Sequence, residues 1–539
     1  MSFFRKKSNS KIHSNSISTS QMMKTSSTNE LKTNLQENIQ IIKDSLGKSS
    51  DIIIREIRIG KEETIKAGII YTDGLTDTDS LQNFILETLM LDIKGTELQK
   101  KVSPEQNLIS VLKDFAMTVG EIKELTNFEE LFSGLLSGDT ILLIDGYAQG
   151  LIISNRQWVE RGVTESTAQM VVRGPREGFS ENLRVNTALV RRKIKDPNLW
   201  MESKVIGKRT KTNVSMMYIN GIVNDKTVKE VRLRLDKIDI DGILESGNIE
   251  ELIQDAPLSP FPTVFNTERP DIVAAALLEG RIAILVDGTP FVLIVPALFT
   301  QFFQSSEDYY QRADIASLIR LLRFFAFTIA LLAPAFFIAI TTFHHVMLPP
   351  ALLISLAAQR EGVPFPAFVE AIIMEVTFEI LREAGVRMPR NIGSAMSIVG
   401  AFVIGTAAVE AGIISAAMVI VVSITAISSF VSPTYDLAIS VRMLRFGFMA
   451  LAASFGLVGI TIGLIALLLH LCSLRSFGVP YMSPVAPFNL PDQEDTFIRL
   501  PRWKMFTRPS LINQQNIVRQ QDSASAKPEP PKNKEYEGV

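Results

Sequence analysis

Glutamates in an otherwise apolar part of the chain are the residues with the clearest chemical meaning. The segment FPAFVEAIIMEVTFEILREAG carries four of them. At 100° per helical residue, Glu375, Glu379 and Glu383 form one slowly drifting stripe. Glu410 is the single charge between residues 391 and 435. A carboxylate at bilayer depth costs at least about 2.5–3.5 kcal/mol, so such residues usually face a bundle interior or a water path.

Two of these carboxylates have no basic partner at helical spacing. An arginine follows Glu379 and Glu383 three or four residues later, whereas none stands at that spacing from Glu375 or Glu410. If copies of the chain surround an axis, such a glutamate becomes a ring of carboxylates that attracts cations. We therefore expect Glu375, Glu410 and Glu379 to be candidates for an ion path. The alternative is a helix lying in the membrane interface with its glutamates in water.

One Asp-Gly pair recurs in two related apolar stretches. LLSGDTILLIDGYAQGLIIS (135–154) aligns without a gap with LLEGRIAILVDGTPFVLIVP (277–296). A strand, Asp-Gly and a second strand predict a hairpin with a type I′ turn, which needs φ > 0 at both central residues. We therefore assign Asp145-Gly146 and Asp287-Gly288 to structural turns. The alternative is a carboxylate nucleophile at one of these aspartates, but no acid or base partner lies nearby in sequence.

Motifs for catalysis, metal binding and nucleotide binding are absent from the sequence. The chain has one cysteine and four histidines, and it contains no GxxxxGK[ST], GxGxxG, HExxH, CxxC or GxSxG. We therefore expect no enzyme activity, no metal and no cofactor. The net charge of −2 gives no overall field that would attract nucleic acid.

The soluble front half, which would position the Asp-Gly pairs, predicts an α/β fold. Strands such as DIIIREIRI and TIKAGIIYTDG precede the capped helix expected from DTDSLQNFILETLML. NVSMMYINGIVND resembles TIKAGIIYTDGLTD, so we expect two related subdomains, 33–155 and 201–303. The Arg- and Lys-rich residues 156–200 predict a solvated connector helix, or alternatively a phosphate or anionic-lipid patch. Residues 1–32 form a polar head that we expect to be disordered.

The back half predicts a polytopic α-helical membrane domain over residues 324–474. No Lys, Arg, Asp or Glu occurs between Arg323 and Arg360, or from Phe446 to Leu474, and about 20 apolar residues cross a bilayer. We expect about four crossings plus a re-entrant or amphipathic helix. A juxtamembrane coupler (304–323) precedes this domain, and a cytoplasmic tail, disordered at its end, follows from residue 475 to residue 539. Cations before the first span place the N-terminal region in the cytoplasm.

The last apolar segment carries a face of small residues. Gly456, Gly459 and Gly463 lie on it, and the last two form a GxxxG motif. Small residues let helix backbones approach closely, so we expect this face to pack against another helix.

Several long blocks resemble one known family. They are PFPTVFNTERPDIVAAALLEGRIAILVDGTPFVLIVP, FFQSSEDYYQR, VPFPAFVEAIIMEVTFEILREAGVRMPR, SPTYDLAISVRMLRF and RGPREGFSENLRVNTALVRRKIK. These blocks are similar to the A subunit of GerA-type spore germinant receptors, and the match runs from about residue 50 to residue 490. The head and the end of the tail lie outside it.

The resemblance implies a cellular role and partners. It implies a multi-pass protein of the spore inner membrane, with its N-terminal region facing the cytoplasm or spore core. Its partners would be a transporter-like B subunit that senses nutrient, a C subunit lipoprotein, membrane lipid and further copies of itself, plausibly in a pentamer. The implied function is a nutrient-gated ion channel that releases monovalent cations at the start of germination. The alternatives are a SpoVAF-like accessory channel and a non-conducting scaffold subunit.

Overall fold

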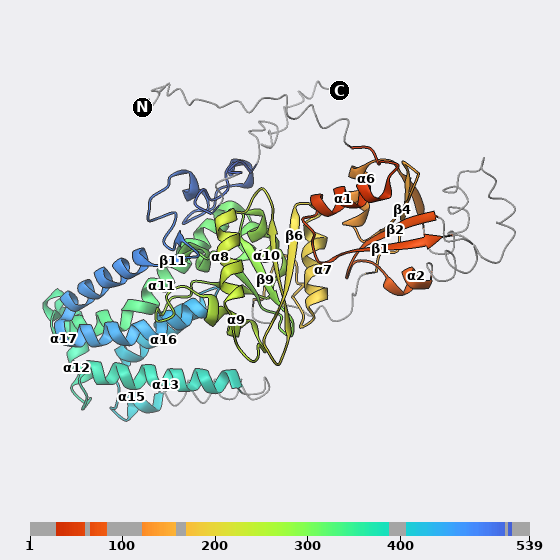
Figure 1. Cartoon of the computed structure of the whole chain (residues 1–539). Coiled ribbons are helices and arrows are strands. Elements are labelled where there is room, and N and C mark those ends of the chain that lie inside the picture. Colours follow the sequence, from red (N-terminus) through yellow and green to blue (C-terminus); the bar gives the residue numbers. More distant parts are fainter. Residues whose placement is uncertain are drawn as a thin grey trace, which may run out of the picture. The chain divides into compact units, whose positions relative to one another are not determined.

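The structure is a computed structural model of the 539-residue chain, and it describes residues 29–59, 65–83, 121–157, 169–387, 406–512 and 516–519. The chain forms two compact units (Figure 1), which are described separately. Unit 1 comprises Met1–Glu160 with Ile194–Asn198, and unit 2 comprises Arg161–Lys193 with Leu199–Val539. Nearly all of the expected polar head, the end of the tail and most of the helix expected after residue 77 lie outside the described residues.

Unit 1 is an antiparallel sheet in the strand order β1-β2-β4-β5-β3. Leu35 and Ile39 of α1 and Leu131 of α6 are buried together with the sheet residues Ile70 and Leu143. The strands expected from DIIIREIRI and TIKAGIIYTDG are present as β1 and β2. The elements are α1 (Leu35–Ser45), β1 (Ile52–Ile59), β2 (Ile65–Thr72), α2 (Thr78–Asn83), β3 (Ile122–Leu125), α6 (Phe128–Leu135), β4 (Thr140–Ile144) and β5 (Gly150–Ile153).

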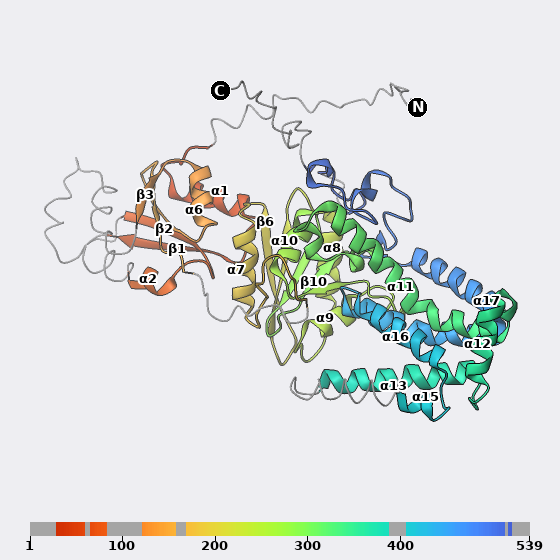
Figure 2. The ribbon, with the colours of Figure 1, turned by 180° about the vertical axis from the view of Figure 1, so that it is seen from behind.

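Unit 2 begins with a second five-stranded sheet of the same topology. Its strand order is β6-β7-β9-β10-β8, which repeats the first sheet position by position. Its elements are α7 (Leu183–Lys193), β6 (Leu199–Ile206), β7 (Thr212–Ile219), α8 (Asp225–Asp236), α9 (Ser246–Ile253), β8 (Phe265–Thr267), α10 (Pro270–Leu278), β9 (Ile282–Val286) and β10 (Val292–Val295). Figure 2 shows these elements from behind.

The second repeat starts earlier in the chain than the boundary expected at residue 201. Helix α7 lies inside the stretch expected to be a connector, and it packs on α10 and β9. Its residues Leu189 and Val190 are buried. This helix has a short apolar stripe, but Arg and Lys residues stand beside it on the same helix. The sequence pattern therefore resembles that of a solvated connector.

A buried asparagine marks the same position in the first helix of each repeat. The Asn38 side chain bonds to both the backbone N and O of Lys32, and the Asn186 side chain bonds in the same way to Ser180. Both asparagines are at most 2% exposed. The two copies therefore share polar detail as well as topology.

Both Asp-Gly pairs lie in turns, but the expected type I′ geometry is wrong. Five residues, Asp145 to Gln149 in the first copy, separate the paired strands, and only the glycine has positive φ (88° for Gly146 and 92° for Gly288). The aspartate stays out of the left-handed region because its side chain caps a helix. Asp145 Oδ1 accepts from the backbone N of Leu35 at 3.0 Å, and Asp287 Oδ1 accepts from Leu183 at 3.1 Å.

This capping role predicts different outcomes for two substitutions of Asp287. Asp287→Ala leaves the Leu183 N–H without its acceptor, and we expect a loss of about 1 kcal/mol in the free energy of unfolding. Asp287→Asn keeps a side-chain oxygen and should change it little. Denaturant unfolding of the purified protein measures both. Equal losses in the two variants would show that the negative charge, and not the acceptor, is what matters.

The remainder of unit 2 is helical. Among the described residues, α11 and α17 are the two helices long and apolar enough to cross a membrane, and α16 is apolar but has only 15 residues. The expected count of four crossings stays a prediction. The helices are α11 (Ala313–Thr342), α12 (Pro350–Arg360), α13 (Ala367–Arg387), α15 (Ala408–Glu410), α16 (Ala416–Phe430) and α17 (Tyr435–Ser473), and α11 is preceded by the 3-10 turns η3 (Phe299–Phe303) and η4 (Ser306–Tyr309).

Helix α17 is not one straight rod, because it reverses at Gly456. Gly456 has φ of 60° and ψ of −139°, which are not helical values. Ser440 donates to the Pro260 carbonyl, and His470 bonds to the neighbouring Ser259 at 2.8 Å. Thirty residues of straight helix would separate Ser440 from His470 by about 45 Å, so the second limb must return to the first limb's starting point.

The small residues of α17 pack within this hairpin. A Cβ added to Gly459 would lie 2.2 Å from the carbonyl oxygen of Leu451, and one added to Gly463 would lie 2.8 Å from the ring of Phe448. Gly456 itself is the point of reversal. The face expected to pack against another helix thus meets the preceding limb of its own chain.

The chain then returns to the second sheet. After α17, the short strands β11 (Arg475–Ser476) and β12 (Val479–Pro480) carry Phe477 between them, and Phe477 is a buried member of the core around β7 and β9. The guanidinium of Arg234 lies 4.2 Å from its ring centroid. Residues on both sides of the helical region therefore build one hydrophobic core.

Candidate functional site

Two of the four glutamates of α13, Glu375 and Glu379, pair with arginines of α17. Glu375 is 0% exposed and accepts a hydrogen bond from Arg445, which is 1% exposed. Glu379 accepts from Arg442 at 2.6 Å. Glu375 has no basic partner at helical spacing because its partner, Arg445, stands 70 residues later, on another helix.

Arg445 is also held by a backbone carbonyl of α11. Its Nε donates to the Ala330 oxygen at 2.7 Å, at a buried position. In a regular helix that oxygen would accept from the N–H of residue 334, but Pro334 has none. Pro334 therefore frees an acceptor inside the bundle, and Arg445 uses it.

A second fully buried carboxylate of α13, Glu370, is a functional candidate that helical spacing alone did not indicate. It is 0% exposed, and its Oε1 accepts from the Ser415 hydroxyl at 2.5 Å. Ser415 also caps α16 by accepting from the backbone N of Met418. Glu370 does not lie on the stripe formed by the other glutamates. It follows the break REGVPFP, which indicates a helix start, and a polar side chain near a helix start often has a capping partner.

The cluster of Glu370, Glu375, Glu379, Ser415, Arg442 and Arg445, which we call the α13 cluster, is not fully satisfied. Some of its buried atoms have no hydrogen-bond partner in the part of the chain that the structure describes: Glu370 Oε2, Glu375 Oε1, Glu379 Oε1, Arg442 Nε and Arg445 Nη2. Buried polar atoms normally find a protein or water partner, and the cost of leaving them bare is largest in apolar surroundings. The α13 cluster therefore has unused capacity to bind water or ions.

The remaining sequence candidates lie elsewhere. Glu410 ends the short helix α15 with an exposed side chain, so it does not belong to the buried α13 cluster. Glu383 pairs with Arg387 at 2.7 Å, as its spacing indicates, and both side chains are exposed. Of the carboxylates singled out from the sequence, the structure brings Glu375 and Glu379 together and leaves Glu410 apart.

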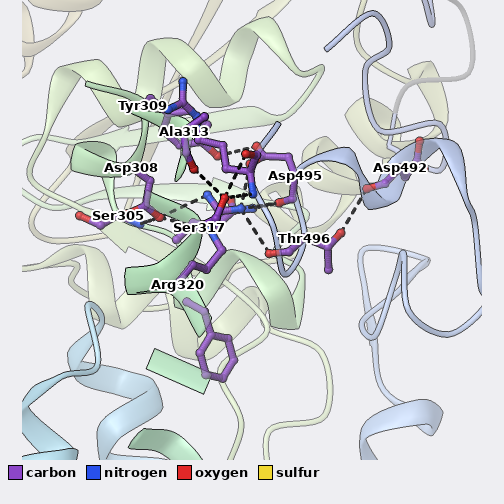
Figure 3. Close-up of polar contacts among 12 residues, drawn as sticks. Ser305, Asp308, Tyr309, Ala313, Ser317, Arg320, Asp492, Asp495 and Thr496 are labelled. Carbon is purple, nitrogen blue, oxygen red and sulfur yellow. Dashed lines mark hydrogen bonds and ion pairs between the residues drawn. The ribbon is translucent and has the colours of Figure 1, made fainter. Parts of the chain in front are cut away.

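A second buried network joins the start of α11 to the tail (Figure 3). Asp308 of η4, 2% exposed, accepts from Arg320 at 3.2 Å and from Arg323 at 2.8 Å. Arg320 is 0% exposed and also donates to the Asp495 carboxylate at 2.8 Å. We call Asp308, Arg320, Arg323 and Asp495 the junction network. It links the neighbouring η4 and α11 to the tail, which stands 175 residues after Arg320.

Aromatic contacts surround the junction network. The Tyr309 hydroxyl donates to Asp495 at 2.6 Å, and burial, with the nearby Asp495 carboxylate, raises the pKa of Tyr309 well above its usual value. The Phe303 ring stacks on Phe324 with centroids 4.1 Å apart. Phe497 of the tail contacts Phe324 in turn, at 4.9 Å. A movement of η3, η4 or the tail would therefore reach the first long helix directly.

The comparison with known proteins now becomes informative. The sequence model of the family described as Bacillus/Clostridium GerA spore germination protein matches residues 40–511, a range that contains both sheets, the α13 cluster and the junction network. The chain belongs to the GerA family. The resemblance stated from the sequence blocks is thereby confirmed.

Similar GerA-family proteins cover most of this chain. Spore germination protein KA of Bacillus subtilis (strain 168) is 50% identical over 498 residues, which are 92% of this chain and 89% of that protein. Uncharacterized membrane protein YfkQ of the same strain is 44% identical over 502 residues, 93% of this chain and 95% of that protein. Spore germination protein GerLA of Bacillus cereus is 41% identical over 483 residues, 90% of this chain and 96% of that protein.

One solved structure also matches this GerA-family chain. It is the crystal structure of the N-terminal domain of the A subunit of the Bacillus megaterium spore germinant receptor GerK3. Its sequence is 46% identical, and it covers 50% of this chain and 97% of its own, with a TM-score of 0.41.

In this GerA-family chain, a carboxyl group of the second sheet region faces the first residues of α17. Glu250 of α9 shares Asn266 with Asp436, and Asn266 donates to Asp436 at 2.7 Å. Burial and the Asp436 carboxylate, with a smaller effect of Glu245, raise the pKa of Glu250 to about 7. The protonated form of Glu250 is therefore favoured where α17 meets the α/β domain.

This raised pKa predicts a pH dependence of stability for the GerA-family chain. Because the folded pKa exceeds the ordinary value of 4.5, the stabilising contribution is fully present below pH 4.5 and is lost as pH rises through about 7. Glu250→Gln should remove this part of the decline. Unfolding midpoints of the variant and wild type between pH 5 and pH 8, with the exposed Glu251→Gln as control, measure it. Parallel curves for Glu250→Gln and wild type would contradict the assignment.

Proposed function

We propose that this chain is the A subunit of a nutrient-responsive spore germinant receptor. The support is its membership of the GerA family and its 50% identity to spore germination protein KA of Bacillus subtilis. We further propose that it acts with a transporter-like B subunit that senses nutrient and with a C subunit lipoprotein. In this proposal it is a multi-pass protein of the spore inner membrane, and its α/β region faces the cytoplasm or spore core.

The proposed activity is that of a nutrient-gated ion channel, formed by several copies and plausibly by five. The observation that carries this proposal is the α13 cluster. Its carboxylates, the fully buried Glu370 and Glu375 and the half-buried Glu379, each have one oxygen without a hydrogen-bond partner in the described part of the chain, among otherwise apolar helices. Carboxylates that line a path supply the oxygen ligands and the negative charge that attract cations. In the closed state Glu375 is neutralised by Arg445. Nutrient binding elsewhere in the complex would favour a state in which the pair separates and the carboxylate meets the path.

Cation flux through the reconstituted receptor complex tests this proposal. Glu375→Gln leaves Arg445 as an uncompensated cation, and we expect nutrient-triggered K⁺ flux to fall at least about tenfold, since 1.4 kcal/mol of added barrier gives that factor. Arg445→Gln leaves the carboxylate unpaired, so K⁺ flux without nutrient should rise. The double variant removes both charges, and its K⁺ flux without nutrient should be lower than that of Arg445→Gln alone.

Controls separate conduction from assembly. Glu383→Gln changes an exposed glutamate of the same helix and should leave flux unchanged. Glu410→Gln shows whether the exposed sequence candidate contributes. Size-exclusion chromatography checks that each variant still assembles. Wild-type flux from all variants would eliminate the α13 cluster as part of the path, and no flux from an assembled wild-type complex would favour a non-conducting scaffold.

A further inference from the structure

A cavity of about 400 Å³ lies in unit 2, beside the beginning of α11. One wall is α10, and a second is η4 with the adjoining Tyr310. The third comes from the tail after η8 (Arg502–Lys504). Cavities of this size accommodate small organic molecules. The cavity belongs to neither the α13 cluster nor the junction network.

The cavity lining is amphipathic. Apolar side chains from α10, β8 and the tail cover part of it, among them Phe265, Ile272, Leu278 and Met505. The polar part is dominated by guanidinium groups, and their charges exceed those of the carboxylates available to them. Of the two lining carboxylates, Asp271 is already occupied, because it pairs with Arg269 at 2.8 Å and accepts from the Tyr310 hydroxyl.

The other carboxylate, Glu279, is shared by two arginines. It lies 3.2 Å from Arg519 and 3.5 Å from Arg281. Arg508, the third guanidinium, donates to neutral oxygens, including the Leu278 carbonyl at 2.9 Å and the Val518 carbonyl at 2.7 Å. Arg502 of η8 also lines the cavity, so four guanidiniums stand beside Glu279 and the already occupied Asp271. Burial and the neighbouring Arg519 lower the pKa of Arg508, as expected for a cation that lacks sufficient counter-charge.

Arg281 leaves part of its hydrogen-bonding capacity unused at the cavity wall. It is 4% exposed, and its Nη1 donates to the Pro296 carbonyl at 2.8 Å and to Gln301. Its Nε is buried and faces the Glu279 carboxylate at 3.5 Å, without a well-formed hydrogen bond in the described part of the chain. A buried guanidinium whose one carboxylate partner is distant and shared with Arg519 favours a further anionic acceptor, because charge-assisted hydrogen bonds to guanidinium are the strong ones.

We propose that this cavity binds a small organic phosphate with an apolar body, and that Arg281, Arg508 and Arg519 hold its phosphoryl group. The planar fork of donors on arginine matches phosphate geometry, and the excess of positive charge matches its charge. The apolar wall around Leu278 and Met505 takes the body of the ligand. A free phosphate ester and a phospholipid headgroup share this chemistry.

Binding would join two parts of the molecule. Arg281 stands immediately before β9 of the second sheet, whereas Arg508 and Arg519 belong to the tail. The same tail reaches α11 through Asp495. A bound phosphate would therefore hold the tail against α10 at the point where the α/β domain meets the first long helix.

The test is calorimetric titration of phenyl phosphate into the full-length protein in phosphatidylcholine nanodiscs. We expect saturable binding that weakens about tenfold or more in Arg508→Gln and in Arg519→Gln, because each loses a charge-assisted contact. Arg519 is exposed, so its replacement keeps the test valid if Arg508→Gln loosens the tail. Arg475→Gln, an exposed arginine outside the cavity, should bind as wild type.

Competition distinguishes the two sources of phosphate. Displacement of phenyl phosphate by soluble dihexanoyl phosphatidylglycerol would identify a lipid headgroup as the occupant, whereas displacement only by non-lipid phosphate esters would identify a free metabolite. Both results support a phosphate site. Absence of saturable binding, or wild-type affinity in both cavity variants, would overturn it.

Discussion

Asp308→Asn is expected to destabilise the protein by about 3–5 kcal/mol, the usual loss when one partner of a buried ion pair is removed. Asp308 is the only carboxylate that Arg323 contacts within the described chain, and it supports Arg320 as well. The substitution keeps the size of the side chain, so little of the loss comes from packing. Arg323 then has no carboxylate partner in the described chain and Arg320 keeps only Asp495, and both arginines belong to α11, a helix proposed to cross the membrane.

Denaturant unfolding of the detergent-solubilised protein measures this loss. Asp314→Asn is the matched control, because Asp314 pairs with Arg312 a few residues away, on the surface, and its loss should not shift the midpoint detectably. Equal shifts in the two variants would mean that the junction network contributes no more than a solvated ion pair. Nutrient-triggered K⁺ flux of the Asp308→Asn complex is measured as well. A loss of flux at a temperature where the variant stays folded would show that the junction network couples nutrient binding to conduction.

Gly456→Ala is the second substitution for which we expect a large effect, at least about 2 kcal/mol. An alanine at φ of 60° costs about 1–2 kcal/mol in backbone strain. Its Cβ would also lie 2.7 Å from the His344 ring and 3.1 Å from Cβ of Phe343. The Phe343 Cβ is attached directly to the backbone at the end of α11, so this contact leaves little room to relax.

The same helix provides the control for Gly456. Gly447 lies in regular helix with nothing within 4 Å of an added Cβ, so Gly447→Ala should be neutral or stabilising. Combining Gly456→Ala with His344→Ala should recover the steric part of the loss and leave the strain. Unfolding midpoints measure all of these variants. A Gly456→Ala protein as stable as Gly447→Ala would refute the reversal of α17.

The sequence was sufficient for the parts of the fold that local patterns specify. Local patterns predicted the strands β1 and β2, and the gapless repeat around Asp145 and Asp287 predicted the duplication. Such predictions are possible because strand alternation and turn preference depend on residues close together in sequence. The turn type was wrong for a long-range reason: Asp145 caps the distant helix α1, and Asp287 caps α7. Helical spacing, which compares near neighbours, contains no such information.

The candidate site shows the same limit. Carboxylates are rare in apolar membrane segments, and this was enough to single out Glu375. Its pairing with Arg445 depends on how α13 packs against α17. The role of Pro334 likewise appears only once its freed carbonyl is seen beside Arg445. Gly456 was assigned to a packing face because a helical wheel assumes continuous helix, and nothing in the period of the small residues marks a reversal.

The reversal at Gly456 has a mechanical consequence. Both limbs of α17 end on the same loop, since Ser440 bonds to Pro260 and His470 bonds to Ser259. A hairpin whose two ends are bonded to the same loop resists separation of its limbs, because a movement of that loop displaces both limbs together. The hairpin would therefore tilt or slide as one rigid body. Its turn lies beside His344, and its two ends are attached to the region of the second sheet.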